Sequence, residues 1–320
     1  MTTELNDVEA HGRRILTEIE RAVLGKRELL RMMLAALLAD GHVLLEDYPG
    51  LAKTLVAQSF ATVLGLKFKR IQFTPDLLPG DITGGYVYDR KRGDFVLHEG
   101  PVFANVVLAD EINRASPKTQ AALLEAMQER QVTLEGETRR LPEPFIVIAT
   151  QNPIEYEGTF PLPEAQLDRF LVKLGVGYPS AEAEREMLRR RRERRKDAFD
   201  LDAVLAGDDV LSLRRSIEDV HVDPDVERYI VDLVGRTRSD SRVTVGASPR
   251  GSLALLKLAR AQAALDGRSF VLPDDVKTFA GPALAHRLVL EPDLWMVRDA
   301  ADDVIQTCLN GVPVPVVDAG

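Results

Sequence analysis

The sequence predicts an α/β protein in which a parallel sheet is covered by helices on both faces and is followed by a small all-helical domain. Short apolar segments alternate with helical periods up to residue 178, polar motifs directly follow three of those segments, and the period is helical from Pro179 to about 309. Short apolar strands that alternate with helices are typical of a parallel sheet buried on both faces. The predicted division is a core at 1–178, a charged linker helix at 179–206 and a helical domain at 207–320.

Composition limits the class of protein. The chain has 320 residues, of which 45% are apolar and 28% charged, and its net charge is −9. No apolar run approaches the ~20 residues of a membrane span, and the first residues lack the apolar stretch of a signal peptide. The lone Cys308 has no partner for an internal disulfide, which favours a reducing compartment. We therefore expect a cytoplasmic protein, and the negative charge argues against a generally basic, nucleic-acid-binding surface.

The elements of the core follow from apolar periodicity and turn residues. Strands are predicted at 42–46, 67–73, 105–111, 145–152 and 170–176. Helices are predicted at 13–39, with a break at 24–26, and at 53–65 and 117–130. Two β-hairpins are predicted at 84–98 and 131–141.

A highly charged helix, "AEAEREMLRRRRERRKDAF", follows Pro179. Its basic run is of a kind that can bind nucleic acid. The same run contains i,i+4 pairs such as Glu186 with Arg190, which are typical of a solvated linker helix. We favour the linker interpretation.

The segment "HVLLEDYPGLAKTLVAQSF" at 42–60 has the strand, loop and helix order of a phosphate-binding loop. The pattern G-x-x-x-x-G-K-[ST] would place glycine at two positions where this chain has Asp47 and Ala52. Lys53 would reach the β- and γ-phosphates and the Thr54 hydroxyl would bind Mg²⁺. A carboxylate beside a triphosphate is repulsive, so Asp47 would have to point away from the nucleotide. By itself the loop is compatible both with a nucleotide site and with a chance match.

Backbone N–H groups of such a loop point inward at the phosphates, and the following helix presents its positive end. Gly50 provides the sharp turn and Pro49 stiffens the entry. The predicted nucleotide contacts in the loop are Tyr48, Pro49, Gly50, Leu51, Ala52, Lys53, Thr54 and Leu55.

Two further apolar strands end in polar residues. "VVLADEINRA" places Asp110 where it can hold Mg²⁺ and Glu111 where it can orient or deprotonate water. The alternative is an acidic pair that caps the next helix. "ATQNP" places the amide of Asn152 at a strand end, where it can position the attacking water. In an open parallel sheet ligands bind at the carboxyl ends of the strands, so the three motifs together favour nucleotide hydrolysis.

With these residues in view, the chain resembles the MoxR-type AAA+ ATPases. The segments that carry the resemblance cover almost the whole chain: "GHVLLEDYPGLAKTLVAQSFA", "RIQFTPDLLPGDITG", "VLADEINRASPKTQAALLEAMQERQVT", "IATQNPIEYEGTFPLPEAQLDRF" and "ASPRGSLALL". The resemblance implies a P-loop AAA+ αβα core and a helical lid, with ATP/ADP and Mg²⁺ as cofactors. It also implies that Asp47 and Ala52 are family variations, while Tyr48 stands where the family usually has an aliphatic residue.

The resemblance implies roles for two arginines. Arg169, in "LDRF", matches the arginine finger that reaches the γ-phosphate of a neighbouring subunit; the alternative is an internal partner of Asp168 or Glu164. Arg250, in "SPRG", matches the second sensor arginine, which couples loss of the γ-phosphate to lid movement. Its alternative is an ordinary exposed arginine in the first turn of a helix.

Other matches are less specific. "VLGK" matches the segment that packs on adenine, which implies contacts from Val23, Leu24 and Gly25; the family more often has Gln in place of Lys26. Arg114 and Arg130 are candidates for the subunit interface. The two hairpins match the helix-two insert and the pre-sensor hairpin of one AAA+ clade, and they are candidates for client contact or, alternatively, decoration of the sheet edge.

The resemblance implies an ATP-driven remodeller that forms a ring, expected to be a homo-hexamer, and matures or activates a partner protein or complex, including by metal or cofactor insertion. It also implies a separate partner with a von Willebrand factor A domain. Three alternatives stay open: a nucleic-acid motor, a nucleotide-gated scaffold with little turnover, and a chelatase subunit. We expect neither nucleic acid nor a membrane span.

Overall fold

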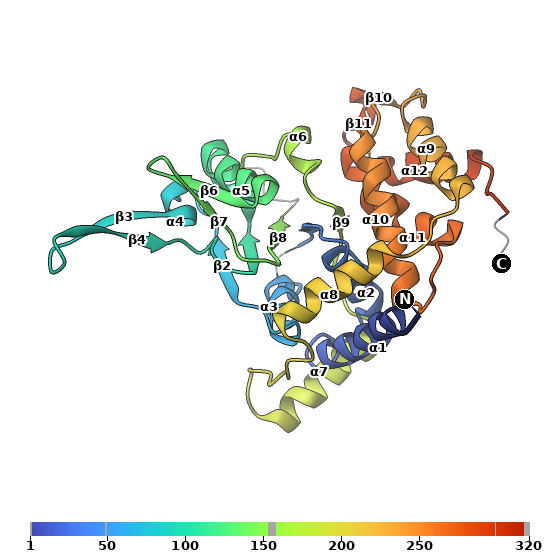
Figure 1. Ribbon diagram of the computed structural model, residues 1–320. Coiled ribbons are helices and arrows are strands. Elements are labelled where there is room, and N and C mark those ends of the chain that lie inside the picture. Colours follow the sequence, from blue (N-terminus) through green and yellow to red (C-terminus); the bar gives the residue numbers. More distant parts are fainter. Residues whose placement is uncertain (1, 49, 153–157, 298, 317–320) are drawn as a thin grey trace.

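The computed structural model describes residues 2–48, 50–152, 158–297 and 299–316 (Figure 1). At its centre lies a parallel sheet of five strands in the order β2-β5-β8-β1-β9. The strands are β1 (Val43–Glu46), β2 (Phe68–Gln72), β5 (Val106–Asp110), β8 (Ile146–Gln151) and β9 (Val172–Leu174). The predicted α/β fold with a parallel sheet is confirmed.

Helices cover both faces of this sheet. They are α1 (Thr2–Ile19), α2 (Arg27–Leu38), α3 (Lys53–Val63), α4 (Pro79–Thr83), α5 (Pro117–Glu129) and α6 (Glu164–Leu167). Val43 and Leu45 pack into one hydrophobic cluster with α1, α2 and α3, whereas Leu44 packs into a second cluster with α4 and α5. Successive residues of a strand point to opposite faces, so an entirely apolar strand is what a sheet between two helical layers requires.

The first helix is longer than the sequence indicated. We predicted helix from residue 13, and α1 begins at Thr2. Its first turns are polar and so carry a weak helical period, but Val8, Ile15 and Ile19 are all fully buried on one side of it. Packing of this side against the rest of the core extends the helix beyond the part that periodicity reveals.

The C-terminal part is predominantly helical. It contains α7 (Ala181–Arg194), α8 (Gly207–Glu218), α9 (Pro224–Thr237), α10 (Pro249–Leu265), α11 (Pro273–Leu284) and α12 (Ala300–Gly311). Short 3₁₀ turns lie at Ala285–Arg287 and Pro292–Leu294 in this part and at Ile112–Arg114 in the core. One feature was missed by the sequence analysis: β10 (Val243–Val245) and β11 (Val289–Leu290) form a small antiparallel pair. Strands of two or three residues are too short to give a readable period.

The lid and the core share one hydrophobic cluster, because α10 packs on α1 and α2. Helix α8 contacts α1 and α2 as well as α10. A domain boundary at 206/207 therefore stays an interpretation. Among the described residues, no helix combines the length and the apolar character needed to cross a membrane.

The two predicted hairpins are confirmed. They are β3 (Gly84–Asp89) with β4 (Asp94–Glu99), and β6 (Gln131–Leu134) with β7 (Glu137–Arg140). The first extends far from the body of the molecule (Figure 1). At its base the Tyr86 hydroxyl donates to Glu137 of the second hairpin at 2.8 Å. The two hairpins are thus linked to each other.

Candidate nucleotide-binding site

Three adjacent strands bring the predicted motifs to one edge of the sheet. β1 lies next to β8 and β8 lies next to β5, and all three run in the same direction. Their carboxyl ends carry the phosphate loop, Asn152 and the pair Asp110–Glu111 respectively. The topology therefore places side by side three motifs that are far apart in the sequence.

The loop after β1 ends in a helix terminus that suits an anion. Helix α3 begins at Lys53 with no side-chain cap, and Ala52 before it has a left-handed backbone with φ 57°. Gly50 has φ 82°, and a side chain there would enter open space. The first N–H groups of an uncapped helix have no internal acceptors and bind phosphate readily. The Lys53 Nζ lies over this terminus, where it donates to the carbonyl oxygens of Asp47 at 2.5 Å and Gln151 at 3.2 Å.

Asp47 is turned away from the loop interior. Its carboxylate accepts from the N–H of Tyr48 at 2.7 Å and from the N–H of Gly177, just after β9. Lys26 reinforces this link by donating to the carbonyls of Gly177 at 2.9 Å and Tyr178 at 2.7 Å. The ring of Tyr48 stacks on that of Tyr178 with centroids 6.3 Å apart. Burial lowers the pKa of Lys26, and the Asp47 carboxylate opposes that shift. Asp47 therefore ties the loop to the segment that leads into α7.

Pro49 lies outside the described residues. Leu51, Lys53, Thr54 and Leu55 are half-buried at the start of α3, which leaves part of each side chain accessible from the edge of the sheet.

Asp110 and Glu111 are oriented by one hydroxyl. Thr150 donates to Asp110 Oδ1 at 2.6 Å, and its oxygen accepts from the N–H of Glu111 at 2.8 Å. On its other oxygen, the 8%-exposed Asp110 accepts from Arg70 Nη2 at 2.6 Å. We did not predict Thr150 or Arg70. The sequence did contain a signal for Thr150, because it is a lone hydroxyl residue in an apolar strand. Thr150 directly follows Ala149, which pairs with Ala109 of β5.

Glu111 stands at the accessible side of this pair. It has a left-handed backbone with φ 57°, and its side chain is 26% exposed. Its carboxylate accepts from Gln72 at 2.7 Å and pairs with Arg114 at 3.3 Å. Asn152 is buried on the neighbouring strand end. Together these groups supply what a magnesium nucleotide needs: an ammonium and free helix N–H groups for phosphate, hydroxyl and carboxylate oxygens for Mg²⁺, and a carboxylate with an amide for water.

The predicted arginine finger, Arg169, and the predicted second sensor arginine, Arg250, lie together elsewhere. Arg169 Nη1 donates to the carbonyl of Leu124 at 2.5 Å, and Arg250 lies 3.7 Å from the Asp168 carboxylate. In the part of the chain that the structure describes, neither side chain is hydrogen-bonded or ion-paired to the phosphate loop or to Glu111. The internal partner found for Arg169 is thus a backbone carbonyl.

Asp168 is the centre of a polar junction between core and lid that we did not predict. It accepts from Arg287 Nε at 2.8 Å and from the Ser248 hydroxyl at 3.3 Å. The Arg287 side chain is 4% exposed, and its second nitrogen donates to the carbonyl of Phe170 at 2.8 Å. Burial lowers the pKa of Arg287, and Asp168 opposes the shift. Arg287 fastens the lid to the segment that carries Arg169.

The remaining predicted positions are engaged within the chain. Val23 is buried in the core. Gly25 has φ 68°, and an added Cβ would lie 2.7 Å from the Cβ of Ala183 in α7. The adenine segment, of which half-buried Leu24 is the middle residue, therefore packs against the start of α7. Arg130 pairs with Asp40 at 2.9 Å and does not need a neighbouring subunit as partner.

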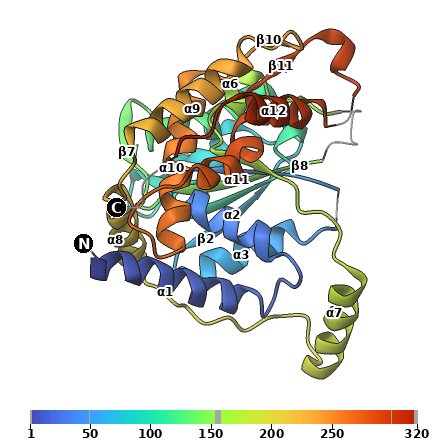
Figure 2. The same ribbon diagram turned by 90° about the vertical axis from the view of Figure 1, so that its right-hand side faces the viewer.

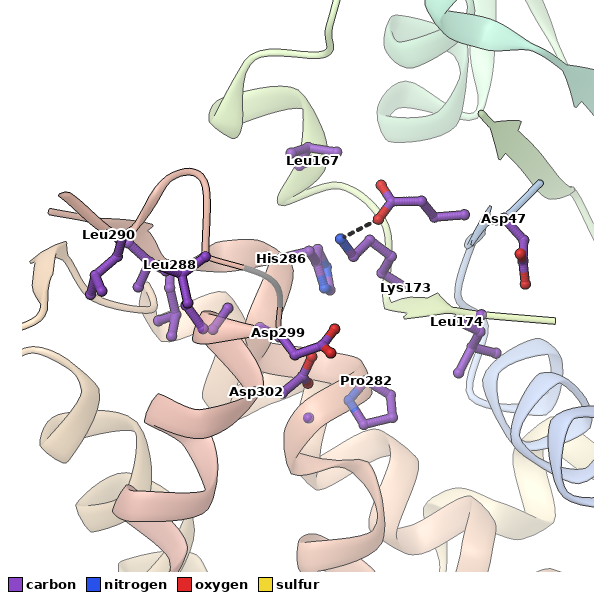
Figure 3. Close-up of a pocket in the computed structure, with 18 of the residues that line it drawn as sticks. Asp47, Leu167, Lys173, Leu174, Pro282, His286, Leu288, Leu290, Asp299 and Asp302 are labelled. Carbon is purple, nitrogen blue, oxygen red and sulfur yellow. Dashed lines mark hydrogen bonds and ion pairs between the residues drawn. The ribbon is translucent and has the colours of Figure 1, made fainter. Parts of the chain in front are cut away.

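A cavity of about 1250 Å³ separates the phosphate loop from the lid (Figure 3). Its core side includes Asp47 and an ion pair of 2.9 Å between Lys173 and Glu46. Its lid side includes His286 and Asp302. Burial raises the pKa of Asp302, and Lys173 opposes that shift.

A central strand that leads into a phosphate loop, an acidic pair on a neighbouring strand and a helical lid define an ATPase of the AAA+ class. Two family models match: "ATPase family associated with various cellular activities (AAA)" over residues 42–172 and "AAA lid domain" over 235–308. The chain belongs to the MoxR family of AAA+ ATPases, as the resemblance implied. It is 45% identical to the chaperone MoxR1 of Mycobacterium tuberculosis over 315 residues, which cover 96% of this chain and 83% of that protein.

Two more relatives extend this result. The chain is 49% identical to the uncharacterized protein YeaC of Bacillus subtilis, with 93% of each chain covered. A crystal structure from Cytophaga hutchinsonii, described as that of a candidate ATPase, superposes with a TM-score of 0.91 at 38% identity and covers 98% of both chains. The similarity therefore includes the core, α7 and the lid.

Proposed function

We propose that this protein is a Mg²⁺-dependent ATPase that works as a ring, expected to be a homo-hexamer, and uses hydrolysis to remodel a protein client. The proposal is carried by the separation of the catalytic groups. Lys53, Asp110 and Glu111 gather at the sheet edge, whereas Arg169 and Arg250 are anchored at the junction of core and lid. A second subunit is the natural source of the arginine finger that such a site requires.

Each residue at the edge has a definite task in this proposal. Lys53 and the first N–H groups of α3 hold the phosphates, while Thr54 and Asp110 hold Mg²⁺. The metal ion would neutralise charge on the phosphate oxygens. Glu111 orients and deprotonates the attacking water, and Asn152 positions it. Residues 48–55 form the phosphate cradle, and residues 23–25 line the adenine.

Arg169 would act on the neighbouring subunit's nucleotide, and Arg250, as the second sensor, would couple loss of the γ-phosphate to lid movement. A guanidinium supplied in trans stabilises the charge of the transition state and is worth about 10³–10⁵ in rate. Because Asp168 lies beside both arginines and also binds Arg287 of the lid, loss of the γ-phosphate in one subunit can bias the lid of the next. Successive hydrolysis events around the ring would then move the lids of the subunits.

The projecting hairpin is the candidate contact for the client. Near its tip Tyr88 and Phe95 are 53% and 63% exposed and pack edge to face at 5.4 Å. Exposed aromatic rings are typical of binding surfaces. The proposal includes maturation or activation of the client in the cytoplasm, metal or cofactor insertion as one form of it, and a von Willebrand factor A partner. The proposal also identifies the hairpin of β3 and β4 as the helix-two insert of that AAA+ clade.

A nucleic-acid motor is less well supported. The net charge is −9. In the second hairpin Glu137 engages Arg139 at 2.6 Å and so neutralises one of the cations that DNA would need. A nucleotide-gated scaffold would differ from the proposed remodeller in its low ATP turnover. A chelatase subunit would differ from it in the client.

ATP hydrolysis measured against protein concentration tests the proposal, with Glu111→Gln and Arg169→Ala as variants. Specific activity should rise with concentration, and each variant alone should lose at least about 10²-fold in turnover. Because Glu111→Gln retains its finger and Arg169→Ala retains its water-orienting carboxylate, mixing the two should restore part of the activity. Arg215→Ala, at an exposed position of α8 in the lid, is the matched arginine control and should behave like wild type. Wild type that binds ATP but shows no turnover at any concentration would replace the remodeller with the scaffold.

A further inference from the structure

Helix α7 concentrates positive charge on an acidic molecule. Residues 181–196 contain eight Lys or Arg and four Glu, a net charge of +4 in a chain of net −9, so the other residues together carry −13. None of the residues of α7 is buried. The helix extends away from the rest of the molecule (Figure 2).

Most of these cations already have partners within the chain. Arg190 donates to the carbonyl of Glu20 at 3.3 Å and thereby anchors α7 on the end of α1. Five of the eight cations have partners: Arg189 with Glu186 and Glu193, Arg190 with Glu186, Arg191 with Asp197, Arg194 over the ring of Phe199, and Lys196 with Asp200. These are contacts of exposed side chains within α7 or between α7 and the chain that follows it, and each contributes little to stability.

The other three cations form a single stripe. The side chains of Arg185, Arg192 and Arg195 have no hydrogen bond or ion pair with any residue that the structure describes. The spacing of Arg185 and Arg192 places them on one face of α7, opposite the face anchored by Arg190. Arg195 follows directly, as the left-handed residue that ends the helix. Leu188 lies in the middle of this face and is 69% exposed. Three guanidinium groups beside an exposed leucine form a surface that suits an acidic partner with an apolar contact of its own.

The position of α7 favours a second copy of this chain as that partner. Ala183 of α7 packs against Gly25 of the adenine segment. Just before α7, Tyr178 stacks on Tyr48 and the N–H of Gly177 is held by Asp47. The start of α7 therefore lies beside the nucleotide site, and the stripe extends outward from there. In the ring proposed above, on which this inference rests, a neighbouring subunit covers that site.

The lid offers a complementary face. On α9, Val231 is 60% exposed, and Glu227 and Asp232 beside it are exposed and have no side-chain partner among the described residues. Arg228, which lies between these two acids, is paired with Asp225 at 3.0 Å. Helices α7 and α9 lie far apart in both views (Figures 1 and 2). A surface on one side that fits a different surface on the other side generates a head-to-tail ring. We propose that the stripe Arg185, Leu188, Arg192 and Arg195 of one copy docks on the Glu227, Val231 and Asp232 face of the next.

Charge reversal tests this docking. Arg185→Glu/Arg192→Glu and Glu227→Arg/Asp232→Arg should each shift the midpoint of ATP-dependent assembly, measured by sedimentation velocity, to at least about tenfold higher concentration. Mixing the two variants should restore assembly, since each reversed α7 then meets a reversed α9. The matched control is Arg189→Glu/Arg191→Glu, which makes the same charge change on the same helix outside the stripe and should stay within about twofold of wild type. Circular dichroism checks that the helix content of each variant equals that of wild type.

Assembly of the α7 variant at the wild-type concentration, or absence of rescue on mixing, would overturn the docking. A labelled single-stranded oligonucleotide is the probe for the other occupant: binding by wild type that the α7 variant loses, with assembly unchanged, assigns the stripe to nucleic acid. Sedimentation and turnover are read separately, so wild type that assembles without hydrolysing ATP contradicts the proposed function and leaves the docking intact. Wild type that hydrolyses ATP while the α7 variant assembles normally contradicts the docking alone.

Discussion

Two polar regions of this molecule are built in opposite ways. At the sheet edge, Lys53 is half-buried beside an uncapped helix end and donates to backbone carbonyls. At the junction of core and lid, Arg287 is 4% exposed and is paired with Asp168 at 2.8 Å. A group that must exchange partners with a nucleotide is kept accessible, whereas a group that holds two parts together is buried and matched with an opposite charge. Substitutions at the first region should cost activity, and those at the second should cost stability.

The largest expected effect is on the sheet edge. Lys53→Ala removes the ammonium that meets the phosphates, and we expect ATP turnover to fall about 10²–10³-fold while the free energy of unfolding changes little. Steady-state hydrolysis and urea unfolding measure the two quantities on the same preparation. Lys277→Ala, at an exposed lysine of α11 that pairs with Asp274, is the control and should change neither. A large loss of stability in Lys53→Ala would contradict the statement that the sheet edge contributes to activity and the junction to stability.

The junction should respond in the reverse way. Arg287→Met keeps the volume of the side chain but leaves Asp168 without its buried partner, which typically costs about 3–5 kcal/mol in the free energy of unfolding. Chemical denaturation measures this loss. Asp168→Leu in the same chain should recover part of it, because the charge left without its partner is then the half-exposed Arg250 rather than a buried group. Arg228→Ala, which removes an exposed pair with Asp225, should cost at most about 1 kcal/mol. A loss in Arg287→Met no larger than that control would mean that the junction does not hold the lid.

The same contrast explains which parts were predictable. Lys53 and Asp110 follow apolar strands directly, so strand pattern and motif lie within a few residues of each other. The junction is assembled from residues 80 and 119 positions apart, Asp168 with Ser248 and Asp168 with Arg287. A lone arginine after a helix carries no sign that it is buried, because burial depends on how the lid packs on the core. Thr150 is intermediate: its strand was predicted, but its role depends on the register with β5.

A third test concerns a buried group without an ion pair. His42 Nδ1 accepts from the N–H of Val147 at 2.9 Å, and Nε2 faces the carbonyl of Met127 at 3.2 Å, a pattern that the neutral ring satisfies. Burial, with help from the Arg130 charge, lowers the pKa of His42 to about 4. Because the folded pKa lies below the unfolded one, this contribution is complete above about pH 6.5 and is lost as pH falls towards 4, by about 3 kcal/mol.

Urea unfolding between pH 7 and pH 4 measures this slope. His42→Gln should flatten it relative to wild type, whereas His98→Gln, at an exposed position of the projecting hairpin, should not. Equal slopes for wild type and His42→Gln would show that this histidine is already protonated, or accessible, in the folded protein.

The smallest expected effect is on the KM for ATP in Asp47→Ala, and its sign distinguishes two roles of the carboxylate. If the carboxylate mainly repels phosphate, Asp47→Ala should lower the KM for ATP. If it mainly ties the loop to Gly177 and Tyr48, the same change should raise KM about 5–10-fold, which is the value of one or two lost hydrogen bonds to a charged group after partial relaxation of the loop. We expect the increase, because both carboxylate oxygens are engaged with backbone N–H groups that lie outside the phosphate cradle or at its entry. Tyr48→Phe keeps the aromatic stack and is the local control, with KM expected near wild type. A lower KM in Asp47→Ala would mean that the loop keeps its shape without the tether, and that the missing glycine at this position weakens the site.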